Sequence, residues 1–243
     1  MKDSVFRFKQ FAVHNERSAM KIGTDGVLLG AWCNTGNARR LLDIGTGTGV
    51  IALMLAQRVP QAHIDAVEID TDSYNEALGN FAQSPWSSRI TAIHADFNQF
   101  ASDTATRYDL IVSNPPFFTN GALPPKEARM QARHCTSLSF SQLIAGATRL
   151  ITPDGRISLI TPCDAWRDVE SAATRHGLHI TRQTTVCPKP DGIAKRILWE
   201  LTPAKPGSAP AQTLTDTLTI ESDEQHNFTP QYTALTRDFY LKM

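Results

Sequence analysis

The chain has 243 residues, of which 41% are hydrophobic and 20% charged, so global disorder, a collagen-like fibre and a disulfide scaffold are excluded. The formal net charge is zero, and no apolar run reaches the roughly 18–20 residues that a membrane helix needs. The start lacks the apolar segment of a secretory signal, and the four cysteines are far apart with no C-x-x-C, so we expect a cytoplasmic protein with reduced thiols and no metal site: Cys33, Cys135, Cys163 and Cys187.

The predicted elements begin with residues 5–13, whose alternation of Phe and Val with polar residues indicates a strand or hairpin arm. Residues 25–33 predict a short apolar helix with Thr24 or Asp25 as its cap. Strands and helices then alternate, with strands expected at 40–44, 63–69, 89–95 and 108–114 and helices at 48–58 and 71–83. The second half predicts helices at 138–150, 164–175 and 231–241 and strands at 155–161, 178–186, 194–201 and 217–220.

This alternation, with near-continuous apolar strands, predicts an α/β fold whose mostly parallel sheet is covered by helices on both faces. The strands at 178–186 and 194–201 are separated by only a short turn region, so one of them should be antiparallel. Substrates of open α/β sheets bind beyond the carboxyl ends of the strands, so the loops that follow the strands are the candidate site.

A glycine-rich turn, LLDIGTGTG over 41–49, joins the first of these strands to its helix. The dinucleotide fingerprint would place its third glycine at Val50, and a Walker loop would need a lysine after the glycines, so a pyrophosphate ligand is disfavoured. The G-x-G-x-G spacing behind an acidic residue resembles the S-adenosylmethionine loop of class I methyltransferases. A carboxylate also suits a ligand that carries an ammonium and a sulfonium. The residues of this candidate cofactor loop are Asp43, Gly45, Thr46, Gly47 and Gly49.

Two further acidic residues follow neighbouring strands. Glu68 ends the second strand, where a carboxylate can accept both ribose hydroxyls. Asp96 and Phe97 follow the third strand, and the resemblance implies that such an acid–apolar pair holds the adenine amino group and ring face. Each residue also has a purely structural interpretation, since Gly45 can serve only to turn the chain, Glu68 can be merely exposed and Asp96 can cap a helix. Their occurrence together at successive strand ends favours the cofactor.

The fourth strand ends in N-P-P-F, formed by Asn114, Pro115, Pro116 and Phe117. Two prolines fix a rigid turn, so a strand-terminating corner is the structural alternative. The functional interpretation is that the Asn114 side-chain oxygen and the Pro115 carbonyl accept hydrogen bonds from an amino group and direct its lone pair, while Phe117 stacks on a planar base. The motif resembles the [DNS]-P-P-[FYW] of amino-group methyltransferases, which act on adenine N6, cytosine N4, guanine N2 or a glutamine amide.

Four stretches, at 8–32, 41–58, 83–90 and 232–241, resemble the bacterial tRNA (adenine-N6)-methyltransferases that act on valine tRNA. The resemblance implies a class I, Rossmann-like fold with a mostly parallel seven-stranded sheet and S-adenosylmethionine as methyl donor. It implies methylation of adenine 37, just 3′ of the anticodon. It divides a single domain, 1–243, into an N-terminal arm and lid (1–36) and a catalytic core (37–243). The lid over the cofactor would contain Met20, Lys21, Thr24 and Asp25, for which a surface lysine and a helix cap are the alternatives.

Charge is unevenly distributed, since residues 41–125 hold three basic and nine acidic residues whereas residues 126–196 hold eleven basic and six acidic ones. Chance fluctuation explains such blocks about as well as a cationic ligand and a polyanionic partner do. The basic segment 126–134 and the N-terminal arm are the candidate RNA contacts. His134 and Cys135 lie in no nucleophile motif and are interpreted as ordinary residues. Ribosomal RNA, DNA or a protein amide as substrate, and a non-catalytic RNA-binding module, remain alternatives, and the oligomeric state is not predicted.

Overall fold

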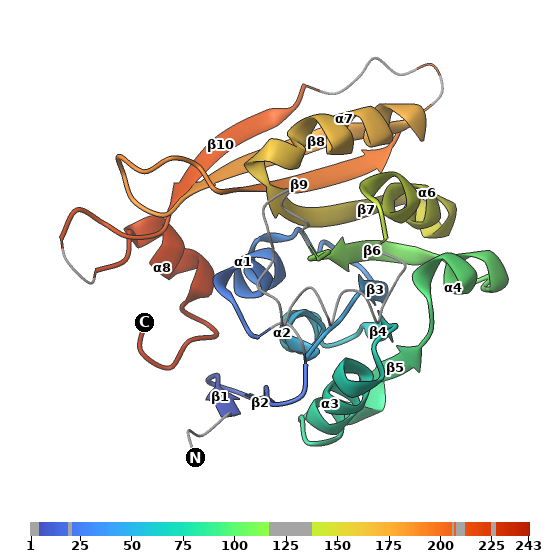
Figure 1. Cartoon of the computed structure of the whole chain (residues 1–243), viewed down its shortest axis with the longest axis horizontal. Coiled ribbons are helices and arrows are strands. Elements are labelled where there is room, and N and C mark those ends of the chain that lie inside the picture. The colour runs from blue at the N-terminus through green and yellow to red at the C-terminus, as the bar shows by residue number, and fades with distance from the viewer. Residues whose placement is uncertain (1–4, 19–20, 117–137, 206, 208–211, 225–226) are drawn as a thin grey trace, which may run out of the picture.

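The computed structural model describes residues 5–18, 21–116, 138–205, 207, 212–224 and 227–243. At its centre lies an eight-stranded sheet with the strand order β10-β8-β9-β7-β6-β3-β4-β5 (Figure 1). The strands are β3 (Arg40–Ile44), β4 (His63–Glu68), β5 (Ile90–His94), β6 (Tyr108–Ser113), β7 (Ile151–Pro162), β8 (Leu178–Cys187), β9 (Arg196–Pro203) and β10 (Leu214–Thr219).

All of these strands run parallel except β9, which pairs antiparallel with both β7 and β8. The prediction of one antiparallel strand near the end of the chain is therefore confirmed. The parallel strands all end at one edge of the sheet, here called the carboxyl edge, and β9 begins there. This edge is where an open α/β sheet binds its ligands.

Helices cover both faces of the sheet, as predicted. One face packs against α1 (Thr24–Trp32), α2 (Val50–Arg58), α3 (Thr71–Ala82) and α8 (Pro230–Thr236), and the other against α4 (Phe97–Asp103), α6 (Phe140–Leu150) and α7 (Trp166–Arg175). Because side chains alternate along a strand, Leu41 enters the first core and Leu42 the second. Both leucines are fully buried, so the sheet has no solvated face at this point.

A small hairpin precedes the sheet. Its strands β1 (Val5–Arg7) and β2 (Ala12–His14) pair antiparallel, which confirms the predicted arm. Phe8 forms a β-bridge with Tyr240, and the Lys9 amide donates to the Phe239 carbonyl at 2.8 Å. The hairpin and the C-terminal segment at 239–240 therefore lie side by side, as Figure 1 shows.

The structure corrects four expectations. The sheet has eight strands instead of the seven implied by the resemblance, because the mostly exposed strand β10 pairs with β8 and covers its free edge. Helix α1 begins at Thr24 and its cap is Gly23, whose extended backbone supplies no side chain, so neither Thr24 nor Asp25 is the cap. Helix α4 was not predicted, and the closing helix ends at Thr236 because the chain then turns to bridge with the hairpin.

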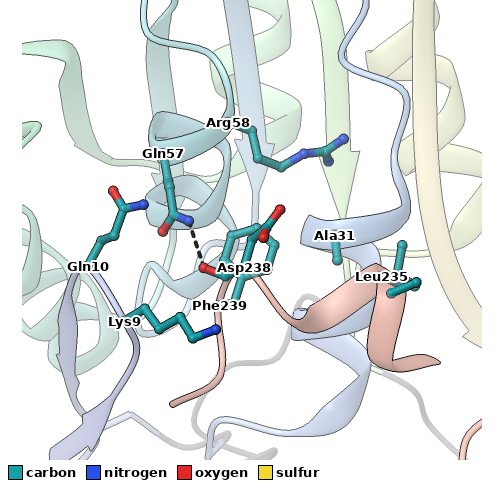
Figure 2. A pocket seen from close by; sticks show the side chains of 9 residues that line it. Lys9, Gln10, Ala31, Gln57, Arg58, Leu235, Asp238 and Phe239 are labelled. Carbon is teal, nitrogen blue, oxygen red and sulfur yellow. Dashed lines mark hydrogen bonds between the residues drawn. The ribbon is translucent and has the colours of Figure 1, made fainter. Parts of the chain in front are cut away.

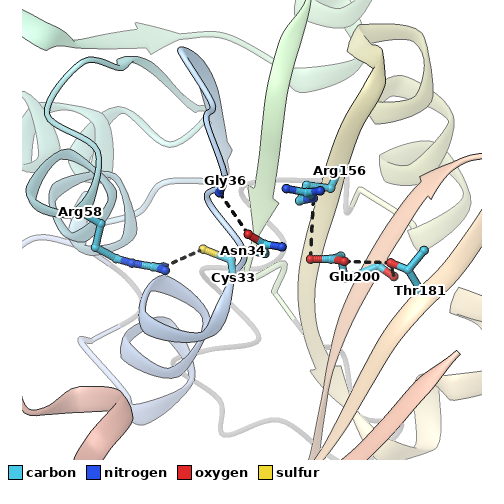
Figure 3. Close-up of polar contacts among 7 residues, drawn as sticks. All are labelled: Cys33, Asn34, Gly36, Arg58, Arg156, Thr181 and Glu200. Carbon is cyan, nitrogen blue, oxygen red and sulfur yellow. Dashed lines mark hydrogen bonds and ion pairs between the residues drawn. The ribbon is translucent and has the colours of Figure 1, made fainter.

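Polar side chains of β7, β8 and β9 contact one another, and others lie where α1 and α2 end (Figure 3). Arg156 pairs with Glu200 at 3.9 Å, and the Thr181 hydroxyl donates to the same carboxylate at 2.9 Å. Nearby, the Arg58 guanidinium donates to the Cys33 sulfur at 3.4 Å, and burial raises the pKa of this thiol to about 11. Burial disfavours the reactive thiolate, so the Cys33 thiol serves packing.

Candidate active site at the carboxyl edge

Strand register brings Glu68 and Asn114, two of the predicted site residues, to the two sides of the glycine turn. Ile44 at the end of β3 lies opposite Val67 of β4 on one side and Ser113 of β6 on the other. Glu68 and Asn114 are the next residues of those two strands and therefore flank the glycine turn that follows Ile44. The ends of β4 and β6 therefore lie on either side of the glycine turn at the carboxyl edge.

The glycine turn is built from residues with left-handed backbone conformations. Gly45, Gly47 and Gly49 have φ values of 68°, 56° and 84°. A Cβ on Gly45 would meet no atom within 4 Å, and one on Gly47 would meet only the Ser18 hydroxyl at 3.9 Å. A Cβ on Gly49 would lie 2.3 Å from the Phe81 ring. The third glycine thus serves packing against α3, whereas the first two leave open space in which a ligand can approach the backbone.

Asp43 is fully buried beneath this turn, with an exposure of 0%. The Thr46 hydroxyl donates to its Oδ2 at 2.6 Å, whereas Oδ1 has no hydrogen-bond partner among the residues that the structure describes. Burial raises the pKa of Asp43 to about 7, against the opposing effects of the Thr46 hydroxyl and the Ala52 backbone amide. A buried carboxylate with a free oxygen is costly unless a cation or a donor reaches it.

Glu68 is occupied mainly by backbone amides. Its Oε1 accepts from the amides of Ile69 and Asp70, both at 2.9 Å, and its Oε2 accepts from Gly47 at 2.8 Å. Burial raises the pKa of this carboxyl, although the amide hydrogen bonds oppose that shift. A carboxylate offers about four acceptor positions, so Oε2 keeps one for a hydroxyl. Recognition of both ribose hydroxyls stays a prediction.

Asp96 and Phe97 have clear structural roles. The Asp96 carboxylate accepts from the Gln99 amide at 3.1 Å and caps helix α4. Phe97 is only 5% exposed, and its ring packs so closely against Gly146 of α6 that a Cβ there would lie 2.6 Å away. Contact of either residue with an adenine ring stays a prediction.

Asn114 directly follows β6, and its Oδ1 is buried without a hydrogen-bond partner among the described residues. Pro115 is buried and Pro116 is exposed. Ser113 anchors the corner because its hydroxyl donates to the Ile44 carbonyl at 2.9 Å. The amide oxygen expected to accept from an amino group is therefore buried and accepts no hydrogen bond from any residue that the structure describes. Phe117 lies outside the described residues.

Helix α3 holds the N-terminal segment 14–18 against the glycine turn, an arrangement that sequence reasoning missed. The Glu76 carboxylate accepts the amides of Glu16, Arg17 and Ser18. Asn80 exchanges two hydrogen bonds with the His14 backbone, at 2.8 and 3.0 Å, and donates to the Thr48 carbonyl at 2.9 Å. The sequence signal for this arrangement is the pair Glu76 and Asn80, two polar residues four positions apart on the buried stripe of an amphipathic helix.

The predicted lid residues are only partly described. The Lys21 ammonium donates to the carbonyls of Asn15 and Glu16, at 2.7 and 3.1 Å. Asp25 pairs with Arg196 of β9 at 2.7 Å. Contact of Lys21 or Asp25 with a cofactor stays a prediction. Met20, the segment 126–134, His134 and Cys135 lie outside the described residues.

A separate hollow of about 590 Å³ lies at the opposite edge of the sheet, where α1 and α2 end (Figure 2). Across this hollow, the Gln57 side-chain amide donates a hydrogen bond to the Asp238 carbonyl at 3.0 Å. Lys9, Arg58 and Phe239 also line it, and none of the predicted site residues does. Within the described ranges, no cluster of three or more His, Cys, Asp or Glu side chains suits a metal ion, and no helix is long and apolar enough to cross a membrane.

Residues 18–163 match the family model of the methyltransferase small domain. A protein of Phocaeicola vulgatus is 46% identical over the full length of both chains, and one of Trichodesmium erythraeum is 46% identical over 98% of each. Both bear the name tRNA1(Val) (adenine(37)-N6)-methyltransferase. The chain belongs to this family of methyltransferases. A predicted O-methyltransferase of Agrobacterium tumefaciens shares the fold, with a TM-score of 0.70 and 20% identity over 88% of this chain and 96% of its own.

The residues of this methyltransferase fit S-adenosylmethionine. The observation that supports the fit is a buried carboxylate oxygen of Asp43 without a partner in the described part of the chain, next to two glycines with open space above them. A sulfonium and an ammonium provide the positive charge that such a carboxylate requires. The class I fold, the glycine turn and the acidic strand ends therefore agree on one methyl donor.

Proposed function

We propose that the protein methylates the N6 amino group of adenine 37 in valine tRNA with S-adenosylmethionine. The relatives that share 46% identity along the whole chain carry this activity in their names. The observation that carries the chemistry is the buried, unpartnered Oδ1 of Asn114, within the described residues, beside the glycine turn. The substrate class makes tRNA the partner and the cytoplasm the expected location.

The cofactor residues have distinct tasks in this proposal. Asp43, held by Thr46, provides the negative charge beneath the turn, and Gly45 and Gly47 allow close approach. Glu68 offers its remaining acceptor position to a ribose hydroxyl. When bound, S-adenosylmethionine supplies a methyl group for transfer to a nucleophile, and the positively charged sulfur that carries it is the leaving group.

The Asn114 corner activates the acceptor. The lone pair of an exocyclic amine is delocalised into its ring, which makes the amine a poor nucleophile. Asn114 Oδ1 and the Pro115 carbonyl accept hydrogen bonds from the two amino hydrogens, which localises the lone pair toward the methyl group. The proline pair fixes both acceptors before substrate arrives, so little reorganisation is needed. The amino proton leaves to water after transfer, without a side-chain base.

The test is methyl transfer from tritiated S-adenosylmethionine to unmodified valine tRNA. We expect the wild-type protein to label this tRNA at N6 of adenine 37, which nuclease digestion and mass spectrometry identify. Asn114→Ala should lower kcat by roughly a hundredfold or more, as loss of an oriented acceptor does elsewhere, while cofactor affinity stays within a few-fold. Asn75→Ala, an exposed change of the same type on α3, is the control. Labelling of ribosomal RNA or a protein but not of valine tRNA would refute the assignment.

A further inference from the structure

Strand β7 extends further beyond the carboxyl edge than its neighbour β6, which ends just before Asn114. Ser113, the last residue of β6, lies opposite Leu159, yet β7 continues to Pro162. Three more residues at about 3.3 Å each raise β7 about 10 Å beyond the corner. The start of β9 pairs with this extension, Arg196 opposite Pro162. The result is a wall beside the site where the target amine is expected.

The top of this wall carries a patch formed by Trp166, Arg167, Ile193 and Lys195. Trp166 begins α7 and is 42% exposed, and Ile193 in the loop between β8 and β9 is 80% exposed. The Lys195 carbonyl accepts from the Cys163 amide at 3.3 Å, which places the loop beside the start of α7. Two large apolar side chains are thus exposed together with two cations at the carboxyl edge.

Packing does not account for the exposed tryptophan. Helix α7 buries Val169, Ala172 and Ala173, and Trp166 continues this stripe by one turn toward the carboxyl edge without being covered. The Arg167 guanidinium lies over the indole, 5.2 Å from the ring centroid, which orients the ring. An oriented, solvent-exposed aromatic ring next to a cation is the arrangement on which nucleobases stack in proteins that bind single-stranded nucleic acid.

Charges of both signs surround the loop. Lys195 is exposed and its ammonium forms no ion pair with any residue that the structure describes. Lys189 pairs with Glu221 at 3.6 Å and Arg196 pairs with Asp25, so these two cations are partly neutralised. The exposed acids nearby are Asp164, Asp168 and Asp191. Among the described residues, Arg167 and Lys195 form no ion pair, so these two cations beside the Trp166 ring are the groups of the patch that can contact an anion.

We propose that this patch, the Trp166 patch, binds the RNA strand that flanks the target adenine. Trp166 stacks on an unpaired base, and Lys195 and Arg167 contact backbone phosphates. The proposal rests on the proposed function, because the height of the wall matters only if the acceptor base lies at Asn114. An anticodon loop provides both requirements, unstacked bases and closely spaced phosphates.

The test is fluorescence anisotropy with a labelled, unmodified valine tRNA anticodon stem-loop at several salt concentrations. Trp166→Ala should weaken binding about tenfold and Trp166→Phe about twofold, since a smaller ring still stacks. Lys195→Gln should reduce the slope of log affinity against log salt by about 0.7–0.9, as loss of one phosphate contact does. Lys205→Gln removes the same charge at the opposite edge, where Lys205 pairs with Asp154 at 2.7 Å, and should bind as the wild type does.

Calorimetry with S-adenosylmethionine should give wild-type affinity for all four variants, and thermal melting should show that they fold. Trp166→Ala and Lys195→Gln binding the stem-loop as tightly as Lys205→Gln would overturn the proposal, as would binding that does not weaken with salt and so points to a protein partner. If the variants weaken RNA binding but the wild type leaves adenine 37 unmethylated, the proposed function fails and the patch stands.

Discussion

Replacement of Glu76 by Gln tests whether the N-terminal segment is part of the cofactor site. The carboxylate accepts three backbone amides, and only the Ser18 amide, at 2.8 Å, bonds to Oε2. A glutamine keeps one acceptor oxygen for Glu16 and Arg17 but turns an NH₂ toward Ser18. A hydrogen bond to a charged group contributes about 1.5–3 kcal/mol, so we expect a loss of about 2–3 kcal/mol in the free energy of unfolding or of segment docking.

Two assays separate these costs. Urea denaturation followed by tryptophan fluorescence measures global stability, and hydrogen exchange of the amides at 16–18 measures local opening. Because Ser18 lies beside Gly47, opening of the segment should also weaken S-adenosylmethionine binding about tenfold or more. Glu170→Gln, an exposed change of the same kind on α7, is the control. Unfolding free energy within about 0.5 kcal/mol of wild type, together with unchanged exchange and cofactor affinity, would refute the reasoning.

Further predictions concern the glycine turn and the buried carboxylate. Gly49→Ala should lower the free energy of unfolding by about 2–4 kcal/mol, because its Cβ would meet the Phe81 ring and its φ is positive. Gly45→Ala should lower the free energy of unfolding by only about 1–2 kcal/mol and should chiefly weaken cofactor binding. Denaturation measures the first effect and calorimetry the second, and a larger loss of cofactor affinity in Gly49→Ala than in Gly45→Ala would contradict the assignment. The pKa of Asp43 rises from 3.8 to about 7 on folding, so the folded protein keeps a proton that the unfolded chain releases and stability falls as pH rises across that window. Relative to Asp43→Asn, the wild type should lose at most about 4 kcal/mol between pH 4 and pH 8, and equal pH profiles in urea denaturation would contradict the shift.

The strands around the site were predictable because buried parallel strands are apolar throughout. Residues 40–44 were placed without error, and the strand ends that carry Glu68 and Asn114 fell within one residue. The register of a parallel sheet then brings those ends together without further information. The edge of the sheet at which the candidate site lies therefore followed from the hydrophobic runs, whereas the roles of its residues stay predictions.

Other features depend on tertiary contacts that no local pattern reveals. Helix α4 spans only seven residues and was missed because so short a segment has little periodicity. Strand β10 is mostly exposed, so its place at the sheet edge follows from pairing with β8 and not from an apolar run. The contacts of Glu76 join segments about sixty residues apart, and a buried carboxylate reveals its partners only once the chain is folded.

The bridge between Phe8 and Tyr240 has a consequence for synthesis. The hairpin leads directly into the segment that Glu76 holds beside the glycine turn, yet the hairpin itself rests on residues 239 and 240. Domains begin to fold during synthesis, but a contact between residues 8–9 and 239–240 cannot form before both segments have been synthesised. Phe8 and Lys9 therefore gain these partners only after residues 239 and 240 have been synthesised, whereas the segment 16–18 can already bind Glu76 of α3.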